Sequence, residues 1–433
     1  MCGLVGLVGR NRRLSGKVIS AFDKMVSALS HRGPDDFGYW FSEDQNVALG
    51  HRRLSIIDLT AAGQQPMHSA DDRLVMIFNG EIYNFREIRN ELRAAGVNFK
   101  GTSDSEVLLE AIAQWGVAQT LPRLNGMFAF ALWDRSLKRL TLARDHIGIK
   151  PLYWGYVGDE LVFASELSAF SHHPAWSPNL NIQSVWGFLQ KGYVQGPKSI
   201  YESIQRLGPG EILEWSPGTD AKLSHHWNLQ DVASSGISEQ CRDRANAINT
   251  IDDLLIDSVR RQSISDVPLG AMLSGGIDST LITAIMAKNS PNRVKTFTIG
   301  FDSKAFDESD YAEAIAAHLG TDHMTLTADL SDLATVVEKL PEIYDEPFAD
   351  SSQIPTFLLS KMTREHVTVA LSGDGGDELF AGYNRYRFGE SGLLAALTGN
   401  GAIGAAARAI IPLLSREAWD RLFAAIPARV RPA

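Results

Sequence analysis

The stretch VPLGAMLSGGIDS, residues 267–279, decides the fold of the second half of this 433-residue chain. It begins as an apolar run typical of a buried strand, predicted over Val267–Leu273, and passes through two glycines into a helix predicted over Ser279–Lys288. Glycines let a ligand approach the backbone closely, and a helix N-terminus offers unpaired N–H groups and a positive dipole end. The stretch therefore indicates an anion-binding loop, although an ordinary strand–helix turn has the same spacing.

Strands and helices alternate along the rest of this half. Helices are predicted over 245–261, 311–319 and 355–365, and strands over 294–301 and 367–371. Such alternation is typical of a doubly wound α/β domain with a parallel sheet. A second glycine loop, Ser372–Asp377, follows the last strand, and Ile299-Gly300-Phe301 closes the strand over 294–301. Because open α/β sheets bind ligands at the carboxyl ends of their strands, we expect all three segments to line one site.

Each glycine loop carries an aspartate, Asp278 in the first and Asp377 in the second. Carboxylate oxygens are ligands that Mg²⁺ prefers, so the pair could hold a magnesium–pyrophosphate group. Capping of the helices that follow is the alternative, and it is compatible with that role. The loops match neither the Walker A sequence nor G-x-G-x-x-G.

The first 215 residues follow another pattern, in which antiparallel strands outnumber helices. Strands are predicted over 74–78, 128–133, 139–143, 152–156 and 161–163. Asn79-Gly80 is a hairpin-turn signal. Helices are predicted over Ser20–Leu29 and from a capping box at Ser103 and Glu106 to Trp115. We predict a layered α+β domain over residues 2–215, a closing hairpin and linker over 216–244, and the α/β domain over 245–433.

Composition excludes several classes of protein. The apolar fraction is 44%, too high for a largely disordered chain, and the net charge is −10 without a run of basic residues, which argues against nucleic-acid binding. Two cysteines, Cys2 and Cys241, cannot build a disulfide scaffold or a four-cysteine zinc site. No apolar run reaches the ~18 residues of a membrane span, and the first residues do not resemble a signal peptide. We expect a cytoplasmic protein without a membrane partner.

Cys2 has the position of an N-terminal nucleophile. Met1 precedes a small residue and is expected to be removed, which leaves Cys2 first. An α-amino group has a pKa of about 7.7–8.0, so it can act as a base beside its own thiol. Taken alone, a cysteine at position 2 would be incidental.

Four segments after Cys2 place this cysteine in a pattern: His31–Asp35, Arg53–Ile56, Asn79–Asn84 and Ser103–Asp104. They resemble the glutamine-hydrolysing domain of class II amidotransferases. The resemblance implies that Arg53 and Asp104 hold the α-carboxylate and α-amino group of glutamine. It also implies an oxyanion hole made by the Asn79 side chain and the Gly80 backbone N–H. The full implied set for glutamine is Arg53, Leu54, Asn79, Gly80, Glu81 and Asp104. For His31–Asp35 we predict a structural turn beside the site.

At the two glycine loops the chain resembles the ATP-pyrophosphatases, which cleave ATP to AMP and pyrophosphate while adenylating a substrate. The two domains in this order resemble glutamine-hydrolysing asparagine synthetases from Cys2 to about Arg387, with further matches at Arg144–Tyr153 and Asp266–Pro268. The implied reaction hydrolyses glutamine at Cys2 through a thioester and passes ammonia internally. ATP, with Mg²⁺, adenylates the aspartate β-carboxylate, and ammonia displaces AMP to give asparagine.

The resemblance also assigns residues to the second site. The implied ATP set is Leu273, Ser274, Gly275, Gly276, Asp278, Ser279, Ile299, Ser372 and Gly373. Asp374 stands where some members carry Glu, at the position associated with the acyl-adenylate. An acidic cluster, Asp345, Glu346 and Asp350, is read as a solvated helix end rather than a border of the acceptor site. His225-His226 is read as a surface pair.

The motifs bind glutamine and ATP and do not name the acceptor, so two alternatives stay open. One is an amidotransferase of the same build that acts on another carboxylate, such as a polysaccharide uronic acid. The other is a relative that retains only glutaminase or binding activity. The sequence does not determine the oligomeric state, and a homodimer is compatible with it.

The last residues carry an apolar stripe with helical spacing, formed by Trp419, Leu422, Phe423 and Ile426. The resemblance implies a synthetase domain that extends well beyond this point. We therefore expect an incomplete synthetase domain with an exposed apolar patch, which would keep glutaminase chemistry and make little asparagine alone. The alternative is a natural variant whose tail packs back on the sheet or on a second subunit.

Overall fold

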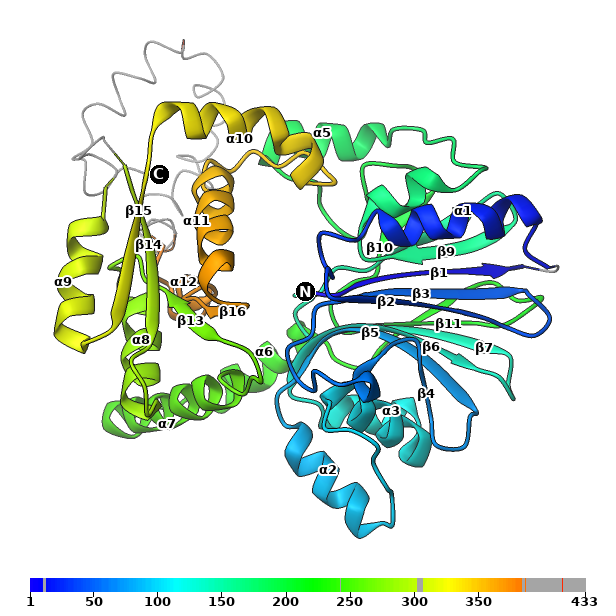
Figure 1. The fold of residues 1–433 in the computed structure, drawn as a ribbon, viewed down its shortest axis with the longest axis horizontal. Coiled ribbons are helices and arrows are strands. Elements are labelled where there is room, and N and C mark those ends of the chain that lie inside the picture. The colour runs from blue at the N-terminus through cyan, green and yellow to red at the C-terminus, as the bar shows by residue number, and fades with distance from the viewer. Residues whose placement is uncertain (11–12, 242, 302–306, 384–385, 387–414, 416–433) are drawn as a thin grey trace, which may run out of the picture.

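The computed structural model describes residues 1–10, 13–241, 243–301, 307–383, 386 and 415 (Figure 1). The N-terminal half stacks two antiparallel sheets, and the C-terminal half is built on a parallel sheet, so the predicted fold classes are confirmed. Figure 1 shows the N-terminal half on the right and the C-terminal half on the left. None of the described helices is long and apolar enough to cross a membrane.

The first sheet has six strands in the order β10-β8-β9-β1-β3-β2. Their bounds are β1 (Gly3–Gly9), β2 (Asp36–Phe41), β3 (Val47–Arg53), β8 (Tyr153–Val157), β9 (Glu160–Ala164) and β10 (Ile204–Arg206). β1 pairs with β3 on one side and β9 on the other, and all seven of its residues are buried. Cys2 directly precedes β1, so the central strand of this sheet fixes the cysteine.

The second sheet runs β12-β11-β7-β6-β5-β4. Its strands are β4 (Met67–His68), β5 (Leu74–Ile82), β6 (Gly126–Asp134), β7 (Arg139–Arg144), β11 (Glu211–Trp215) and β12 (Lys222–His225). The apolar run of β5 is continuous because both faces are covered. Val75 and Ile77 join the core between the sheets, whereas Met76 and Phe78 join the core under the helices.

Helices cover the two outer faces and complete a four-layer arrangement. They are α1 (Gly16–Ser27), α2 (Phe85–Ala94), α3 (Asp104–Trp115), the short α4 (Val117–Thr120) and α5 (Ile182–Lys191). α1 packs on the first sheet with the 3₁₀ turn Leu167–His172, and α2 and α3 pack on the second (Figure 1). Further 3₁₀ turns span Ala61–Gly63 and Leu121–Arg123.

The hairpin predicted at Asn79-Gly80 is wrong, because β5 continues through both residues to Ile82. Asn79 lies opposite Ala129 and Gly80 opposite Phe128 in the ladder with β6. A Cβ on Gly80 would lie 2.3 Å from the Met127 carbonyl oxygen, so glycine serves close strand approach here rather than a turn.

The N-termini of α3 and α1 can be compared with the starts predicted from the sequence. Ser103 caps α3 by accepting the Glu106 N–H, as predicted. The Glu106 carboxylate, however, accepts the N–H groups of Lys100 and Gly101 rather than that of Ser103, so the reciprocal half of the capping box is not formed. α1 begins four residues before the predicted start because Ser15 caps it.

The C-terminal sheet is parallel, with the order β15-β14-β13-β16. Its strands are β13 (Leu269–Met272), β14 (Lys295–Phe301), β15 (Asp322–Ala328) and β16 (Val369–Leu371). The edge strand β15 was not predicted from the sequence. The strand order reverses between β13 and β16, so the loops that follow these two strands lie side by side at a topological switch point.

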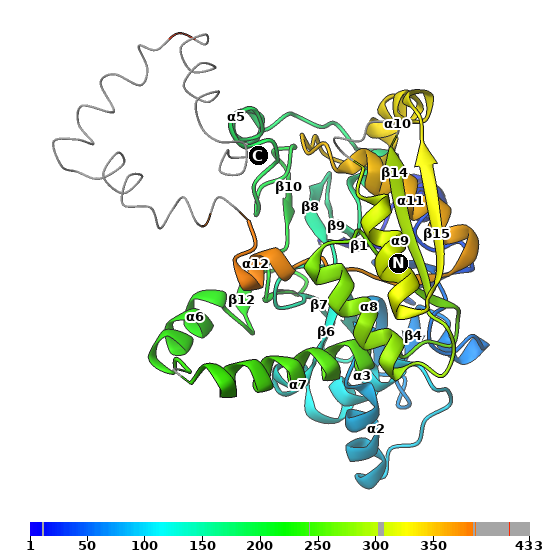
Figure 2. The same cartoon turned by 90° about the vertical axis from the view of Figure 1, so that its left-hand side faces the viewer.

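Helices flank this sheet on both faces. They are α7 (Arg244–Gln262), α8 (Ile277–Asn289), α9 (Ser309–Leu319), α10 (Leu330–Ile343), α11 (Gln353–His366) and the short α12 (Gly376–Phe380). Figure 1 shows α8 and α9 on one face and α11 on the other, and Figure 2 views the half from the α8 and α9 side. α10 was also absent from the sequence prediction.

Residues 216–244, predicted as a closing hairpin and linker, contain strand β12 and helix α6 (Leu229–Ser238), of which no residue is buried. Arg387 and the apolar stripe Trp419, Leu422, Phe423 and Ile426 lie outside the described residues.

Candidate active site

Cys2 lies at the head of β1 against the loop that follows β3. Its Sγ accepts a hydrogen bond from the Leu54 N–H at 3.4 Å, and its thiol lies 3.7 Å from the Leu54 carbonyl oxygen. Burial raises the pKa of the Cys2 thiol, while the adjacent amino group acts in the opposite direction. Burial likewise lowers the pKa of the Met1 amino group to about 6. A thiol held in its neutral form needs a nearby base to become a nucleophile.

Asn79 offers an unused amide next to this thiol. Its side chain is 1% exposed, and neither Nδ2 nor Oδ1 has a hydrogen-bond partner among the described residues. Asn79 and Gly80 line the same cavity as Cys2. A buried amide without a partner costs free energy, so the Asn79 side chain is available to hydrogen-bond a polar group that enters the cavity.

Two buried carboxylates lie at the same end. Asp104 accepts the Ile82 N–H at 2.9 Å and the Ser105 N–H at 2.8 Å. Burial raises the pKa of Asp104 to about 6. The pKa of Glu81 is also raised, first by burial and then by the charge of Asp104. The two acids therefore favour a cation between or beside them, such as an ammonium group.

Arg53 ends β3, where its guanidinium is held by loop carbonyls. Nη1 donates to the Thr60 oxygen at 3.2 Å, and Nη2 donates to the Asp58 oxygen. A Cβ on Gly63 would lie 2.0 Å from Nη2, so only glycine leaves room for this arrangement. The charge of Arg53 acts on Cys2 and on Asp104. Of the predicted glutamine set, Leu54, Asn79, Gly80 and Glu81 line the cavity with Cys2. Arg53 and Asp104 are buried and are not among its lining residues.

The first glycine loop follows β13. Gly275 has φ +82°, a conformation that favours glycine, and a Cβ there would lie 2.9 Å from the Tyr311 Cβ. Ser274 and Ser279 join their hydroxyls at 3.0 Å and close the loop. Leu273 is buried, and Ile299 lies on the neighbouring strand β14.

The second glycine loop packs on the first. A Cβ on Gly373 would lie 2.6 Å from the Ser279 backbone nitrogen, and one on Gly376 would lie 2.5 Å from the Asp278 carboxyl carbon. In the second loop, Ser372 Oγ donates to the Asp374 carboxylate at 2.9 Å. The two loops therefore form one surface, as their positions after neighbouring strands predicted.

Asp278 and Asp377, the aspartates predicted to hold magnesium, contact different glycines in the structure. Asp278 lies against Gly376, whereas Asp377 lies in α12 against Gly382, where a Cβ would meet its Oδ1 at 1.9 Å. Among the described residues, no cluster of three or more His, Cys, Asp or Glu side chains is placed to bind a metal. Both aspartates supply carboxylate oxygens, which suit Mg²⁺ held largely by substrate phosphates.

One cavity of about 740 Å³ connects the two sites. At one end it is lined by Cys2, Asn79, Gly80 and Glu81, and at the other by Asp278 and the loop Ser372–Gly376. The lining of the cavity is mostly apolar and includes Met127, Ile149, Leu255, Leu281 and Leu371. Cys2, Asp278 and the second glycine loop thus face a common, partly apolar space.

Two site residues were quoted in the sequence motifs but given no role. Lys150 is 4% exposed, lines the cavity, and lies 3.1 Å from the Met1 sulfur, and burial lowers its pKa to about 8. Arg32 lies in the segment predicted as a structural turn beside the site, where it donates to the Cys2 carbonyl oxygen and pairs with Glu166. Both are basic residues inside segments that match a family pattern, which was the available signal.

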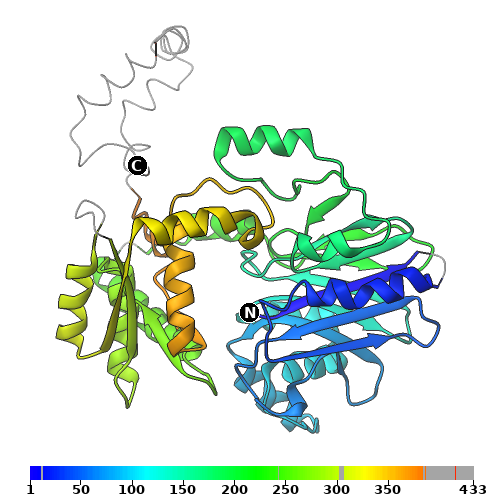
Figure 3. The same cartoon turned by 45° about the horizontal axis from the view of Figure 1, so that its top comes forward.

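The interpretation of Asp345 and Glu346 as solvated is wrong. Asp345 accepts the N–H groups of Leu167 and Ser168 at 2.5 and 3.0 Å, and burial raises its pKa to about 6. Glu346 accepts the Tyr153 hydroxyl at 2.9 Å and pairs with Arg206. These acids fasten the loop between α10 and α11 to the N-terminal half. Figure 3 shows the yellow helix α10 reaching toward that half.

The structure also places Asp350 and the pair His225-His226. Asp350 stays local and caps the Ser352 N–H at 2.8 Å. The surface-pair interpretation holds for His225, which is exposed, but not for His226, which stacks on Phe128 and lies 2.9 Å from the Arg144 carbonyl oxygen.

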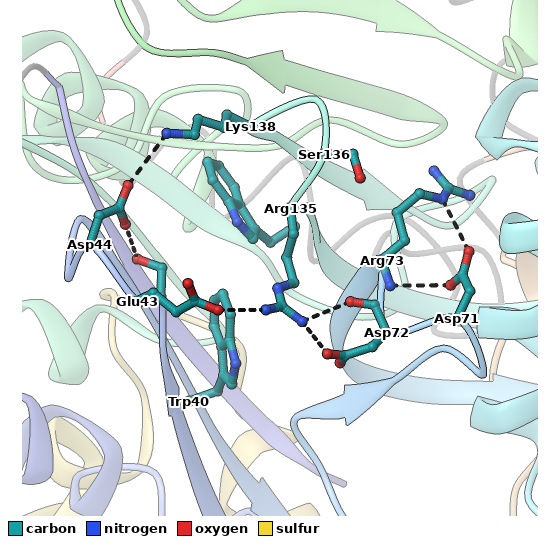
Figure 4. Close-up of a pocket in the computed structure, with 11 residues that line it drawn as sticks. Trp40, Glu43, Asp44, Asp71, Asp72, Arg73, Arg135, Ser136 and Lys138 are labelled. Atoms are coloured by element: carbon teal, nitrogen blue, oxygen red, sulfur yellow. Dashed lines mark hydrogen bonds and ion pairs between the residues drawn. The ribbon is translucent and has the colours of Figure 1, made fainter.

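A second pocket, of about 520 Å³, lies over strand ends and turns of the N-terminal half (Figure 4). Its charged side chains neutralise one another: Arg135 with Glu43 and Asp72, Arg73 with Asp71, and Lys138 with Asp44. With each charge already paired, we assign the pocket no binding role.

Comparison with known proteins agrees with this geometry. Residues 1–227 match the family model of the glutamine amidotransferase domain, and residues 250–429 match that of asparagine synthase. The fold and the site thus define a glutamine amidotransferase domain joined to a synthase domain.

Similar proteins of known family show the family to which this chain belongs. The chain is 34% identical over 412 residues to putative glutamine-hydrolysing asparagine synthetase 2 of Methanocaldococcus jannaschii, covering 89% of this chain and 77% of that protein. It is 35% identical over 390 residues to glutamine-hydrolysing asparagine synthetase 1 of Bacillus subtilis, covering 89% of this chain and 60% of the relative. The chain belongs to the glutamine-hydrolysing asparagine synthetase family, and it spans about 60% of the length of several of these relatives.

Among solved structures, the chain is similar to glutamine phosphoribosylpyrophosphate amidotransferase of Bacillus subtilis. The identity is 17% and the TM-score 0.40, with 75% of this chain and 65% of that chain covered. A likeness this low carries no argument about function.

Proposed function

We propose that this chain hydrolyses glutamine at Cys2 and uses the ammonia for ATP-dependent amidation of the aspartate side-chain carboxylate. The observation that carries the proposal is the single cavity that Cys2 and Asn79 share with Asp278 and Ser372–Gly376. Family membership supports the same two reactions in one chain.

In the first reaction the Cys2 thiolate attacks the side-chain amide carbon of glutamine. After removal of Met1, the α-amino group of Cys2 takes the thiol proton and later gives it to the departing nitrogen. The Asn79 amide and the Gly80 N–H stabilise the oxyanion. Ammonia leaves, and water then cleaves the thioester to give glutamate.

Arg53 and the two buried acids orient the substrate. The guanidinium would bind the α-carboxylate of glutamine, and Asp104, with Glu81 near it, would accept the α-ammonium group. The raised pKa of Asp104 fits this role, because a cationic partner lowers that pKa again and the carboxylate becomes the stable form.

In the second reaction ATP binds over the two glycine loops. The aspartate carboxylate attacks the α-phosphorus, pyrophosphate leaves, and ammonia then displaces AMP from the acyl-adenylate. Asp374 would act at this intermediate. Asp278 and Asp377 would hold magnesium, whose charge neutralises the pyrophosphate group.

The shared cavity would give ammonia a route from Cys2 to the second glycine loop. Ammonia is protonated in water near neutral pH and is then no longer a nucleophile. The apolar wall residues Met127, Ile149 and Leu255 disfavour the charged ammonium form, so the neutral form crosses.

The test is a product screen by mass spectrometry with glutamine, ATP and a panel of carboxylates. We expect glutamate, AMP, pyrophosphate and asparagine with aspartate as the acceptor. Amidation of a uronic acid in place of aspartate would replace the acceptor in this proposal, and glutamine hydrolysis without any amidation would limit the chain to a glutaminase.

A further inference from the structure

The segment Asp266-Val267-Pro268 matches the family pattern, yet the reactions above give it no role. It lies between α7 and β13 in the C-terminal half, but its contacts reach the loop that follows β3 in the N-terminal half. The Asp266 carboxylate accepts the Asp58 N–H at 2.8 Å, and the Asp266 N–H donates to the Ile56 carbonyl oxygen at 3.0 Å. Asp266 thus holds this loop at two points.

The loop it holds carries glutamine-site residues. Leu54, at its start, contacts the Cys2 thiol through its N–H, and Arg53 directly precedes it. Both guanidinium contacts of Arg53 are to carbonyl oxygens of this loop, at Asp58 and Thr60. The position of Arg53 therefore depends on the conformation of residues 54–60.

Asp58 is the centre of that conformation. Its backbone has φ +60°, which is unfavourable for a residue with a side chain and needs support from its surroundings. Its carboxylate accepts the N–H groups of Thr60 and Thr102, the latter only two residues before Asp104. A Cβ on Gly101 would lie 2.4 Å from the Asp58 Oδ2, so the fit is close.

Apolar packing lies near this contact. Ile264, two residues before Asp266, and Ile57 of the loop each pack against the apolar core beneath α2 and α3. The Pro268 carbonyl oxygen accepts the N–H groups of Val369, which begins β16, and of Thr368, which precedes it. The segment is thus fixed to the N-terminal half at one end and to the parallel sheet at the other.

We propose that Asp266 is a positioning residue for the glutamine site, supplied by the opposite half of the chain. By bonding Asp58 and Ile56 it fixes the loop that sets Arg53 and Leu54. The glutamine site is therefore fully ordered only when the segment 264–268 is docked. The inference rests on the proposed glutaminase reaction for its kinetic test and on the contact itself for its structural test.

The kinetic test measures glutamine hydrolysis by the full chain in the Asp266→Ala and Asp266→Asn variants. Loss of the bond in Asp266→Ala should raise the KM for glutamine about tenfold and change kcat less, since Arg53 acts in binding. Asp266→Asn keeps an acceptor oxygen and should restore a KM close to the wild-type value. An unchanged KM in Asp266→Ala overturns the proposal.

A matched control separates positioning from simple attachment of the two halves. Arg261 on α7 pairs at 2.6 Å with Glu87 on α2, another bond between the halves. Among the described residues, the hydrogen bonds and ion pair of Glu87 do not involve residues 54–60. Glu87→Gln should leave the KM for glutamine at the wild-type value. An equal rise of KM in Glu87→Gln and Asp266→Ala would reject a specific role of Asp266.

Hydrogen exchange gives a readout that does not need turnover. We expect faster amide exchange across residues 54–60 in Asp266→Ala than in the wild type, Asp266→Asn or Glu87→Gln. If amide exchange at residues 54–60 is unchanged in Asp266→Ala, Asp266 does not order this loop, even if the wild type hydrolyses glutamine. If the wild type does not hydrolyse glutamine, the proposed reaction fails, while this exchange experiment still decides whether Asp266 orders the loop.

Discussion

The Arg32 guanidinium donates a hydrogen bond of 2.9 Å from Nε to the carbonyl oxygen of Cys2. Its Nη1 pairs with Glu166 at 2.6 Å, so two nitrogens of the planar guanidinium, Nε and Nη1, are held by different partners. Asp345 of the C-terminal half binds the backbone of the next two residues, Leu167 and Ser168. The backbone of the proposed nucleophile is therefore held by a chain of contacts that reaches the other half.

Replacing Arg32 tests this contact. Lysine keeps the charge but cannot bond both Cys2 and Glu166 with one planar group. We expect Arg32→Lys to lower kcat for glutamine hydrolysis about 100-fold through displacement of the thiol. Arg10→Lys, a surface residue paired with Asp220, is the matched control and should keep full activity. Equal kcat values for Arg32→Lys and the wild type would contradict a positioning role.

Asn79 tests the oxyanion site. Its Nδ2 is buried without a partner, which fits a donor that acts only when the oxyanion forms. Asn79→Ala should reduce kcat about 10²–10³-fold with a small change in the KM for glutamine. Steady-state kinetics would separate the two, and a variant that lost only affinity would assign Asn79 to substrate binding.

Asp104 predicts a pH dependence. Burial raises its pKa to about 6, so the free carboxyl is neutral below that pH and ionised above it. Only the ionised form attracts the glutamine ammonium group, so the KM for glutamine should fall as pH rises through about 6. Asp104→Asn should raise KM at neutral pH and flatten the profile. A wild-type KM that stays constant between pH 5 and 7.5 would refute this role.

The aspartates of the glycine loops should affect only the second reaction. Asp278→Asn, close to Gly376, should strongly lower ATP–pyrophosphate exchange and leave glutamine hydrolysis nearly intact. Asp377→Asn should behave in the same way if both carboxylates hold one magnesium–pyrophosphate group. If ATP–pyrophosphate exchange is lost in Asp278→Asn but not in Asp377→Asn, Asp377 has a structural role in α12 and does not hold the metal.

Local patterns were sufficient for the elements with strong signals. The strand and helix around Ser274–Ser279 could be predicted because an apolar run, two glycines and a helix start follow in direct order. β15 was not predicted, because it is an edge strand whose half-buried side chains carry no continuous apolar run. Asn79-Gly80 misled because turn statistics ignore the neighbouring strand β6, which extends the ladder through both residues.

The candidate site also has residues that local sequence patterns predict and residues that they do not. Cys2, Asn79, Asp104 and the two loops could be selected from motifs, since each motif lies within a few residues of sequence. Arg32, Asp345 and Asp266 act through contacts with residues far away in the chain, such as Glu166 and Asp58. No local pattern reveals such pairs, because only the tertiary fold brings them together, within the N-terminal half for Arg32 and Glu166 and across the two halves for Asp266 and Asp58.

The most direct test of the account follows the nitrogen atom. The chain is given glutamine labelled with ¹⁵N in its side-chain amide, together with ATP, aspartate and unlabelled ammonium in excess, and the asparagine is analysed by mass spectrometry. Transfer through the shared cavity predicts asparagine that carries mainly ¹⁵N, and Cys2→Ala should yield only unlabelled asparagine from the added ammonium. Wild-type asparagine that carried the isotope ratio of the bulk solution would contradict the central claim.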